Sequence, residues 1–452
     1  MAVEELLGDV PDRWEYTTLG AACERGGGDI QTGPFGSQLH AADYVLSGIP
    51  SIMPQNIGDN RIVENGIARI TPEDAKRLSR YLVREGDIVY SRRGDVERRA
   101  LVREHEDGWL CGTGCLRVRF GEKGVDSKYA AFYLGHPSVR EWIVRHAHGA
   151  TMPNLNTSIL AACPFVMPPL PEQRAIAHIL GTLDDKIELN RRMNETLEAM
   201  ARALFKSWFV DFNPVRAKAE GRDPGLPQPL ADLFPDSFED SALGDIPKGW
   251  KALPLYETAQ FVNGAAFKSE DFCATGEGLP VVKIAELKDG IGAQTKWSQR
   301  QAGPTQMIDT GDLLYSWSGS PDTSLDVFLW TKGPGLLNQH IFKVVAPTTV
   351  QKRFVFYLLK YLRPILVETA RNKQTTGLGH VTVADMKRLL VCWPTNRVLT
   401  SFDEKIAPIF DRAFGNTIEA QTFTALRDTL LPKLISGELR VKDAEQIAET
   451  SA

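Results

Sequence analysis

The longest regular pattern of apolar and polar positions lies between Pro171 and Phe209. On one face, side chains follow one another in steps of four and three residues: Ile176, Leu180, Leu183, Ile187, Asn190, Asn194, Leu197, Ala201, Leu204 and Trp208. These steps give the 3.5-residue repeat of a coiled-coil seam. A helix this long, roughly 58 Å, exceeds an ordinary core helix and cannot bury its seam against itself. We therefore predict a spacer helix over residues 169–210, whose seam amides Asn190 and Asn194 fix the register against a partner helix.

A second seam of the same kind lies near the C-terminus, over residues 395–437. Its members are Phe402, Ile406, Ile409, Ala413, Asn416, Ala420 and Phe423. Ser401 and Glu404 have the spacing of a capping box at its start, and Gly437 stands where a helix commonly ends. Pro408 removes a backbone hydrogen bond and is expected to kink this helix. We predict that the two long helices pair as an antiparallel intramolecular coiled coil.

The segments that precede the two helices also repeat. Residues 85–91, Glu-Gly-Asp-Ile-Val-Tyr-Ser, match residues 310–316, Thr-Gly-Asp-Leu-Leu-Tyr-Ser, at an offset of 225. Residues 132–134 and 356–358 are both Phe-Tyr-Leu, at nearly the same offset. A period this long indicates a duplicated domain, not a solenoid.

This repeat gives the predicted organisation of the chain. It comprises a first domain over 1–168, a spacer helix over 169–210, an acidic Pro- and Gly-rich linker over 211–245, a second domain over 246–394, a second spacer helix over 395–437 and a frayed tail over 438–452. Both domains mix β-forming runs with helical segments and many Gly and Pro turns. The predicted fold class is α+β, with two tandem α/β domains separated by two long antiparallel helices.

Composition narrows the class of protein. A chain of 452 residues with 43% hydrophobic and 24% charged residues is typical of a soluble protein of two or three domains. No apolar run reaches the length of a membrane helix, and the acidic N-terminus lacks the basic start of a signal peptide. Six cysteines form no disulfide framework, and Cys111 with Cys115 makes at most half a zinc site. We expect a cytoplasmic protein that binds no membrane.

The most specific motif spans residues 168–222. It begins with Pro-Pro-Leu-Pro-Glu-Gln, contains Leu-Phe-Lys-Ser-Trp-Phe at the end of the first helix, and continues as Phe-Asn-Pro-Val-Arg-Ala-Lys-Ala-Glu-Gly-Arg. This run resembles the central conserved region of the specificity subunits of Type I restriction–modification systems. The openings at 10–14 and 246–250, the turn after residue 85 and residues 431–439 resemble that family too. The likeness spans nearly the whole chain in two copies.

The resemblance implies two target-recognition domains, each of which reads one half of a two-part sequence in double-stranded DNA. The long helices would hold them apart and dock two methyltransferase subunits, and through these the restriction endonuclease subunits. S-adenosylmethionine, ATP and Mg²⁺ are then expected on the partner subunits, with no cofactor and no metal in this chain. The family implies a non-catalytic subunit of a methyltransferase and endonuclease complex.

Charge and loop composition suggest where DNA would bind. Residues 1–170 carry 19 basic and 22 acidic residues, whereas residues 246–394 carry 17 basic and 12 acidic residues. Arginines cluster in the turn after Tyr90, and arginine suits both phosphate and guanine edges. Amide and hydroxyl side chains on other loops suit base edges. The predicted DNA-binding residues are Ser37, Gln38, Ser91, Arg92, Arg93, Arg98, Arg99, Thr151, Asn154, Lys268, Ser316, Trp317, Ser318, Asn338 and Gln339.

Other functions remain open at this stage. The arginine turn could be a solvated surface with ion pairs to Asp95 and Glu97, and each loop residue could simply stabilise its turn. One globular half could hide a divergent DNA methyltransferase or nuclease, and a scaffold without nucleic acid is a third possibility. Against catalysis, Pro168-Pro169 lacks the flanking polar and aromatic residues of an adenine methyltransferase loop, and no Gly-rich ATP loop is present. A DNA-recognition subunit without catalytic residues is the favoured hypothesis.

Overall fold

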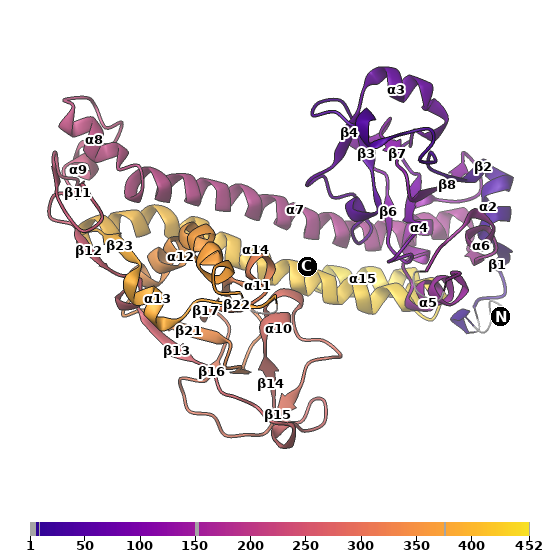
Figure 1. Ribbon diagram of the computed structural model, residues 1–452. Coiled ribbons are helices and arrows are strands. Elements are labelled where there is room, and N and C mark those ends of the chain that lie inside the picture. Colours follow the sequence, from indigo (N-terminus) through magenta and orange to yellow (C-terminus); the bar gives the residue numbers. More distant parts are fainter. Residues whose placement is uncertain (1–5, 9, 150–152, 375–376, 452) are drawn as a thin grey trace. The chain divides into compact units, whose positions relative to one another are not determined.

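The two long helices of the chain are shared between two structural units. The computed structural model describes residues 6–8, 10–149, 153–374 and 377–451 (Figure 1). Unit 1 comprises Met1–Glu188 and Gln421–Ala452, and unit 2 comprises Leu189–Ala420. Helix α7 (Leu170–Phe209) and helix α14 (Asn396–Ser436) therefore each contribute one part to unit 1 and one part to unit 2.

Unit 1 is built on an antiparallel four-stranded sheet. Its strand order is β2 (Gly27–Thr32), β8 (Cys115–Gly121), β5 (Ile88–Ser91) and β6 (Arg99–Leu101). A three-stranded sheet has the order β4 (Ala68–Ile70), β3 (Ile49–Ile52) and β7 (Leu110–Cys111). Strand β1 (Glu15–Thr18) pairs antiparallel with β9 (Pro164–Met167), so the globular part of unit 1 begins and ends at the same place.

Short helices complete unit 1 around its two sheets. They are α2 (Leu19–Gly26), α3 (Pro72–Arg77), α4 (Ser127–Tyr133), α5 (Pro137–His146) and α6 (Thr157–Ala161). Tyr129 and Tyr133 of α4 pack around Phe165, with ring centroids 6.3 and 4.7 Å away. Their hydroxyls donate to the carbonyls of Val166 and Pro164, each at 3.0 Å. The two tyrosines thus fix α4 against β9, the strand that leads into α7.

The Pro-Glu-Gln motif at the start of α7 attaches this helix to unit 1. Gln173 is 1% exposed; its Nε2 donates to the carbonyls of Pro168 and Gly124, and its Oε1 accepts from the backbone of Asp126. Glu172 accepts a hydrogen bond from Nε1 of Trp14 at 3.1 Å. Because a buried amide must satisfy its donors and acceptors, these bonds hold α7 in one orientation on the domain.

Unit 2 repeats the strand order of unit 1. Its antiparallel four-stranded sheet has the order β13 (Gln260–Asn263), β21 (Ile341–Val345), β17 (Leu313–Ser316) and β19 (Asp326–Leu329). Strand β12 (Lys251–Pro254) pairs with β23 (Leu390–Trp393), as β1 pairs with β9. A second sheet has the order β15 (Trp297–Ser298), β14 (Leu279–Val282), β20 (Gly335–Leu337) and β16 (Met307–Ile308). The internal repeat and the α+β fold class expected from the sequence are confirmed.

The helices of unit 2 complete its core. Besides the long helices, they are α8 (Asn213–Ala219), α9 (Gln228–Ala231), α10 (Ile284–Asp289), α11 (Pro321–Ser324), α12 (Thr349–Arg371) and α13 (Val383–Arg388). Phe402 of α14 contacts Phe205 and Phe209 of α7, with ring centroids 6.0 and 4.8 Å apart. Phe354 of α12 lies 5.0 Å from Phe209. These rings join the globular part of unit 2 to the helix pair.

Within unit 2, the helices pair as the seam predicts. Nδ2 of Asn416 donates to Oδ1 of Asn194 at 2.9 Å, and Nδ2 of Asn194 donates to Oγ1 of Thr417 at 3.1 Å. Nδ2 of Asn190 donates to Glu419 at 2.8 Å. In unit 1, Arg427 of α14 donates to Asp184 of α7 at 2.7 Å. The pairing is antiparallel in each unit, and the amides within unit 2 fix its register.

Several local predictions differ from the structure. Helix α14 begins at Asn396, so Ser401 and Glu404 lie inside it and form no cap; buried Val398 and Leu399 extend its apolar face toward the N-terminus. The helix continues without interruption through Pro408, and Gly437 follows it with a φ of 75°.

The linker, which we expect to be ordered in places, and the tail, which we expect to be frayed, both contain ordered elements. The tail predicted to be frayed forms α15 (Val441–Ser451), because Ala444 is fully buried in the core of unit 1. Within the acidic linker, Phe234 is 1% exposed, and its ring packs edge-on against Trp208 with centroids 5.0 Å apart. Nζ of Lys218 donates to the carbonyl of Phe234 at 2.6 Å. The short strands β10 (Phe238–Glu239) and β11 (Ile246–Pro247) then lead into the second domain. Among the helices described, none is both long and apolar enough to cross a membrane.

Candidate nucleic-acid interface

The loops at one end of the four-stranded sheet in unit 1 lie next to one another. Because neighbouring strands are antiparallel, the ends of β2 and β5 lie beside the starts of β8 and β6. The backbone N–H of Gly33 donates to Cys115 at 2.9 Å, and that of Arg92 donates to Gly114 at 2.8 Å. The N–H of Leu155 donates to Arg92 at 2.9 Å. Residues 33–38, 91–98, 112–114 and 153–155 therefore form one loop cluster, which we call the unit 1 loop face.

Unit 2 makes the same three backbone bonds at matching positions. The N–H of Gly264 donates to Ile341 at 3.1 Å, that of Trp317 donates to His340 at 3.4 Å, and that of Val381 donates to Trp317 at 2.9 Å. We call residues 264–272, 317–325, 338–340 and 379–381 the unit 2 loop face. Bridges extend the match, because Arg93 pairs with Asn154 in unit 1 and Ser318 with His380 in unit 2. Both loop faces thus share one scaffold with different side chains.

Some residues predicted to contact DNA in unit 1 are accessible. Ser37, Arg93 and Arg98 are exposed, and Arg92 is half-buried. Nη2 of Arg98 forms an ion pair with Asp95 at 2.9 Å. The turn that carries these arginines is held by backbone bonds: the N–H of Gly94 donates to Pro153, and that of Arg98 donates to Asp95. Arg93 is thereby presented on a fixed backbone with its side chain in solvent.

Other predicted residues of unit 1 have structural roles. Ser91 is 1% exposed, and its hydroxyl donates to the carbonyl of Arg93 at 2.9 Å. Oε1 of Gln38 accepts from the hydroxyl of Tyr81 at 2.9 Å and from the backbone of Phe35 at 3.1 Å. Asn154 is half-buried and exchanges backbone hydrogen bonds with His148. These groups shape the loops. Thr151 lies outside the described residues.

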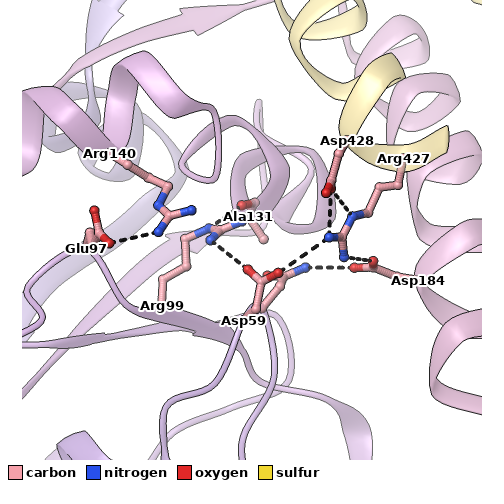
Figure 2. A network of polar contacts seen from close by, with 9 residues as sticks. Asp59, Glu97, Arg99, Ala131, Arg140, Asp184, Arg427 and Asp428 are labelled. Atoms are coloured by element: carbon pink, nitrogen blue, oxygen red, sulfur yellow. Dashed lines mark hydrogen bonds and ion pairs between the residues drawn. The ribbon is translucent and has the colours of Figure 1, made fainter. Parts of the chain in front are cut away.

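Arg99 is not placed to contact DNA, although it lies in the arginine-rich turn. Figure 2 shows its guanidinium inside unit 1, where Nε donates to the carbonyl of Ala131 at 2.7 Å and Nη1 lies 3.7 Å from Asp59. The side chain is 5% exposed, and burial lowers the pKa of its guanidinium. Asp59 also lies 3.5 Å from Arg427, which pairs with Asp184. Arg99 therefore belongs to a polar network that joins β6 to the long helices of unit 1.

Unit 2 presents a different set of groups. Lys268 and Gln339 are exposed, and Ser318 is half-buried. Trp317 is half-buried: its ring stacks on Phe342 with centroids 5.6 Å apart, and its Nε1 donates to Asn263 at 3.1 Å. Ser316 is fully buried and Asn338 is 8% exposed, with Oδ1 accepting from the backbone of His340. Ser316 and Asn338 are thus too buried to reach a ligand, because strand β17 and the turn before β21 turn them inward.

The structure adds two residues that sequence reasoning missed, Thr113 and His380, and places them on the loop faces with candidates such as His340. Thr113 lies between the Gly33 and Arg92 loops of unit 1, at the position that corresponds to Gln339 in unit 2. His340 and His380 lie on the unit 2 loop face, and both are exposed. Aligning the two halves of the sequence at an offset of 225 or 226 along their whole length would have identified these residues, because Asn154 then aligns with His380.

Neither a metal centre nor a reactive thiol is evident in the described part of the chain. No group of three or more His, Cys, Asp and Glu side chains in that part is placed to hold a metal ion. Cys111 and Cys115 are buried, and burial raises the pKa of Cys111 to about 12. A cavity of about 400 Å³ is lined by Leu101, Lys128 and Asp184, among others. It lies past the end of β6, away from the loop face.

Comparison with known proteins agrees with this architecture. Residues 14–199 match the family model described as the Type I restriction modification DNA specificity domain. A Type I restriction enzyme specificity subunit, HindI of Haemophilus influenzae, is 23% identical over 88% of this chain and 96% of its own length. The first domain and most of the first long helix thus match the model of that DNA specificity domain.

Further similarities cover nearly the whole chain. The MjaIX specificity subunit of Methanocaldococcus jannaschii is 23% identical over 97% of this chain and 96% of its own length. The crystal structure of a Type I restriction–modification S subunit from M. genitalium covers 94% of this chain and 96% of its own, with 16% identity and a TM-score of 0.57. That structure shares the fold of this chain.

Proposed function

We propose that this chain is the DNA-recognition subunit of a Type I restriction–modification complex and that each unit reads one half of a two-part target. This proposal rests on the unit 1 and unit 2 loop faces. Three matching backbone hydrogen bonds hold equivalent loops in both units, while the exposed side chains differ between them. A target with two different halves needs one scaffold presented twice with different reading groups.

The exposed groups suit the two kinds of contact that DNA offers. Arg93 and Arg98 in unit 1 can donate two parallel hydrogen bonds to guanine or to a phosphate. Lys268, Gln339 and the histidines of unit 2 offer donors to bases and phosphates. The second domain is also basic, with 17 basic against 12 acidic residues over 246–394, which favours a polyanion.

The long helices would position the partner subunits. Similarity to Type I specificity subunits supports docking of two methyltransferase subunits along α7 and α14, with the endonuclease subunits joining through them. S-adenosylmethionine, ATP and Mg²⁺ would then act on those partners, and this chain would contribute recognition without chemistry of its own, in the cytoplasm. Incubation of the purified chain alone with labelled S-adenosylmethionine and DNA tests this division: transfer of label to DNA would contradict it.

A domain exchange tests the two-reader model. Residues 11–168 are replaced by the first domain of another specificity subunit, and the methylated sequences of a host with complete complexes are mapped before and after. The expected outcome is a change in one half of the target with the other half and the spacing retained. If both halves changed together, the two units would not read independently.

A further inference from the structure

The turn after β2 in unit 1 presents a phenylalanine to solvent. Phe35 is 55% exposed, and glycines lie on both sides of the Pro34–Phe35 pair, at positions 33 and 36. Solvent-exposed apolar side chains are common, so exposure alone assigns no role. What distinguishes Phe35 is the way in which its turn is built and placed.

The backbone of this turn is rigid although the ring is exposed. The carbonyl of Phe35 accepts from the N–H groups of Gln38 at 2.8 Å and Leu39 at 3.3 Å, and its own N–H donates to Oε1 of Gln38 at 3.1 Å. Arg77 donates to the carbonyl of Gln38 at 2.8 Å, and Leu39 is 4% exposed in a small apolar core. The conformational entropy of the turn is therefore already lost in the free protein, which favours binding through the ring.

The turn is an addition to the repeated scaffold. In both units a short capped turn follows the shared glycine: the N–H of His40 donates to Asp43, and that of Lys268 donates to Asp271, each at 2.7 Å. Six residues lie between Gly33 and His40, but only three lie between Gly264 and Lys268. The three extra residues in unit 1 produce the Phe35 turn. In unit 2 the nearby Phe267 is half-buried, stacked with Phe272 at 6.4 Å and covered by Arg300. The fold itself does not require an exposed ring here.

The turn also belongs to the unit 1 loop face. The N–H of Gly33 bonds to Cys115 and that of Arg92 to Gly114, so the Phe35 turn and the arginine turn flank the same short segment, residues 112–114. An apolar ring beside exposed arginines matches the chemistry of duplex DNA, where charged phosphates border apolar base faces.

We propose that Phe35 is an apolar wedge that stacks against the bases of the half-target read by unit 1. This inference rests on the proposed function and adds a specific contact to it. A wedge of this kind inserts at a base step and partly unstacks it, so it favours flexible steps and contributes to sequence preference without a hydrogen bond. Because the ring is uncharged, it adds nothing to the number of phosphates neutralised.

The test uses the full-length chain, alone and with co-expressed methyltransferase subunits. The probes are a duplex that carries the methylated target mapped in the host and a duplex of unrelated sequence. Phe35→Ala is expected to lower affinity for the target duplex roughly 10- to 100-fold, the loss typical of one base–aromatic stack, and to leave the salt slope and the affinity for unrelated DNA unchanged. Phe35→Trp should keep most of the affinity. With 2-aminopurine placed along the half-target, wild-type chain should raise fluorescence at one step and Phe35→Ala should not.

Leu46→Ala is the matched control, because Leu46 is a fully exposed apolar side chain on the turn before β3. The loop face adjoins the opposite end of β3, where the N–H of Gly112 donates to the carbonyl of Ile52, so Leu46 lies away from it. This control should change neither affinity nor fluorescence. Equal thermal midpoints for the Phe35 variants and wild type show that the fold is intact. Unchanged target affinity in Phe35→Ala, or an equal loss on both duplexes, overturns the wedge. A wild-type chain that binds neither duplex, alone or in complex, instead overturns the proposed function.

Discussion

At the scale of single residues, burial separates the arginines of one turn into two groups. Arg93 and Arg98 extend into solvent, whereas Arg99, the next residue along, is enclosed between β6 and α4. Gly135 makes room for it, because a Cβ there would lie 1.8 Å from Nη2 of Arg99. We therefore propose a role in recognition for Arg93 and Arg98 and a role in stability for Arg99, and each role has its own test.

Arg93→Ala should weaken DNA binding without affecting folding. If Arg93 donates to a guanine edge, the loss should be about 1–3 kcal/mol and confined to one base position. If it touches only phosphate, all sequences should bind more weakly and the salt slope should fall by about one. Arg25→Ala is the control, since Arg25 is an exposed arginine just before β2, at the end of the sheet away from the loop face. Equal effects of Arg93→Ala and Arg25→Ala on DNA binding would show that Arg93 contributes no more than any other exposed arginine.

Arg99→Ala should instead destabilise unit 1. The change empties a buried site and leaves the carbonyl of Ala131 without its donor, which together should lower the free energy of unfolding by about 2–4 kcal/mol. Urea denaturation measures this loss. Arg98→Ala, one residue away and exposed, should change stability by less than about 0.5 kcal/mol. A loss of DNA affinity in Arg99→Ala at full stability would contradict the structural assignment.

At the scale of elements, the N-terminus of α5 contains a buried histidine that should make stability depend on pH. His136 is 7% exposed, and its Nδ1 accepts from the backbone of Ser138 at 3.2 Å. Burial lowers the pKa of His136 from 6.5 to about 4. Between these values the unfolded chain binds a proton that the folded chain does not, so stability should fall as the pH decreases from about 6.5 to about 4, by up to roughly 3 kcal/mol.

His136→Asn isolates this contribution, because asparagine keeps the capping acceptor and does not titrate. Urea denaturation of both proteins at pH 7 and at pH 4.5 gives the comparison. The fall in stability between the two pH values should be smaller in the variant. The same fall in both proteins would show that other groups carry the pH dependence.

At the scale of the whole molecule, α7 and α14 run through both units and so connect one loop face to the other. Two seven-residue segments lie opposite each other in the antiparallel pair, Leu189–Glu195 and Phe414–Ala420. They contain the amides of Asn190, Asn194 and Asn416 together with their partners. Removing both segments therefore removes each of these three amides together with its hydrogen-bond partner.

The balanced deletion of residues 189–195 and 414–420 should shorten the unread gap in the target. Seven residues correspond to roughly 10 Å of helix and two turns, so the apolar seam stays in register. That length equals about three base pairs of B-DNA. Methylome mapping should find both half-sequences retained with a gap about three base pairs shorter, after circular dichroism has shown that helix content is retained. Methylation at the original spacing would mean that the helices dock partner subunits and do not set the distance between the two half-sequences.

Local patterns in the sequence were sufficient to predict the two long helices, the repeat and the loops that carry the candidate DNA-binding residues. A seam of 3.5-residue period, a motif repeated at an offset of 225 and clusters of Gly and polar residues are all properties of neighbouring residues in the chain. The structure places the predicted site residues that it describes on or beside the two loop faces.

Only the tertiary structure decided what each side chain does. Arg98 and Arg99 are alike in sequence, and burial against α4, which is distant in the chain, separates them. Gln38 accepts from Tyr81, and Asn338 is buried, because segments far apart in sequence enclose them. The same holds for α15, which is polar overall but helical where Ala444 packs into unit 1. The burial of a side chain depends on contacts with residues far away in the chain, and these contacts cannot be predicted from a pattern of neighbouring residues.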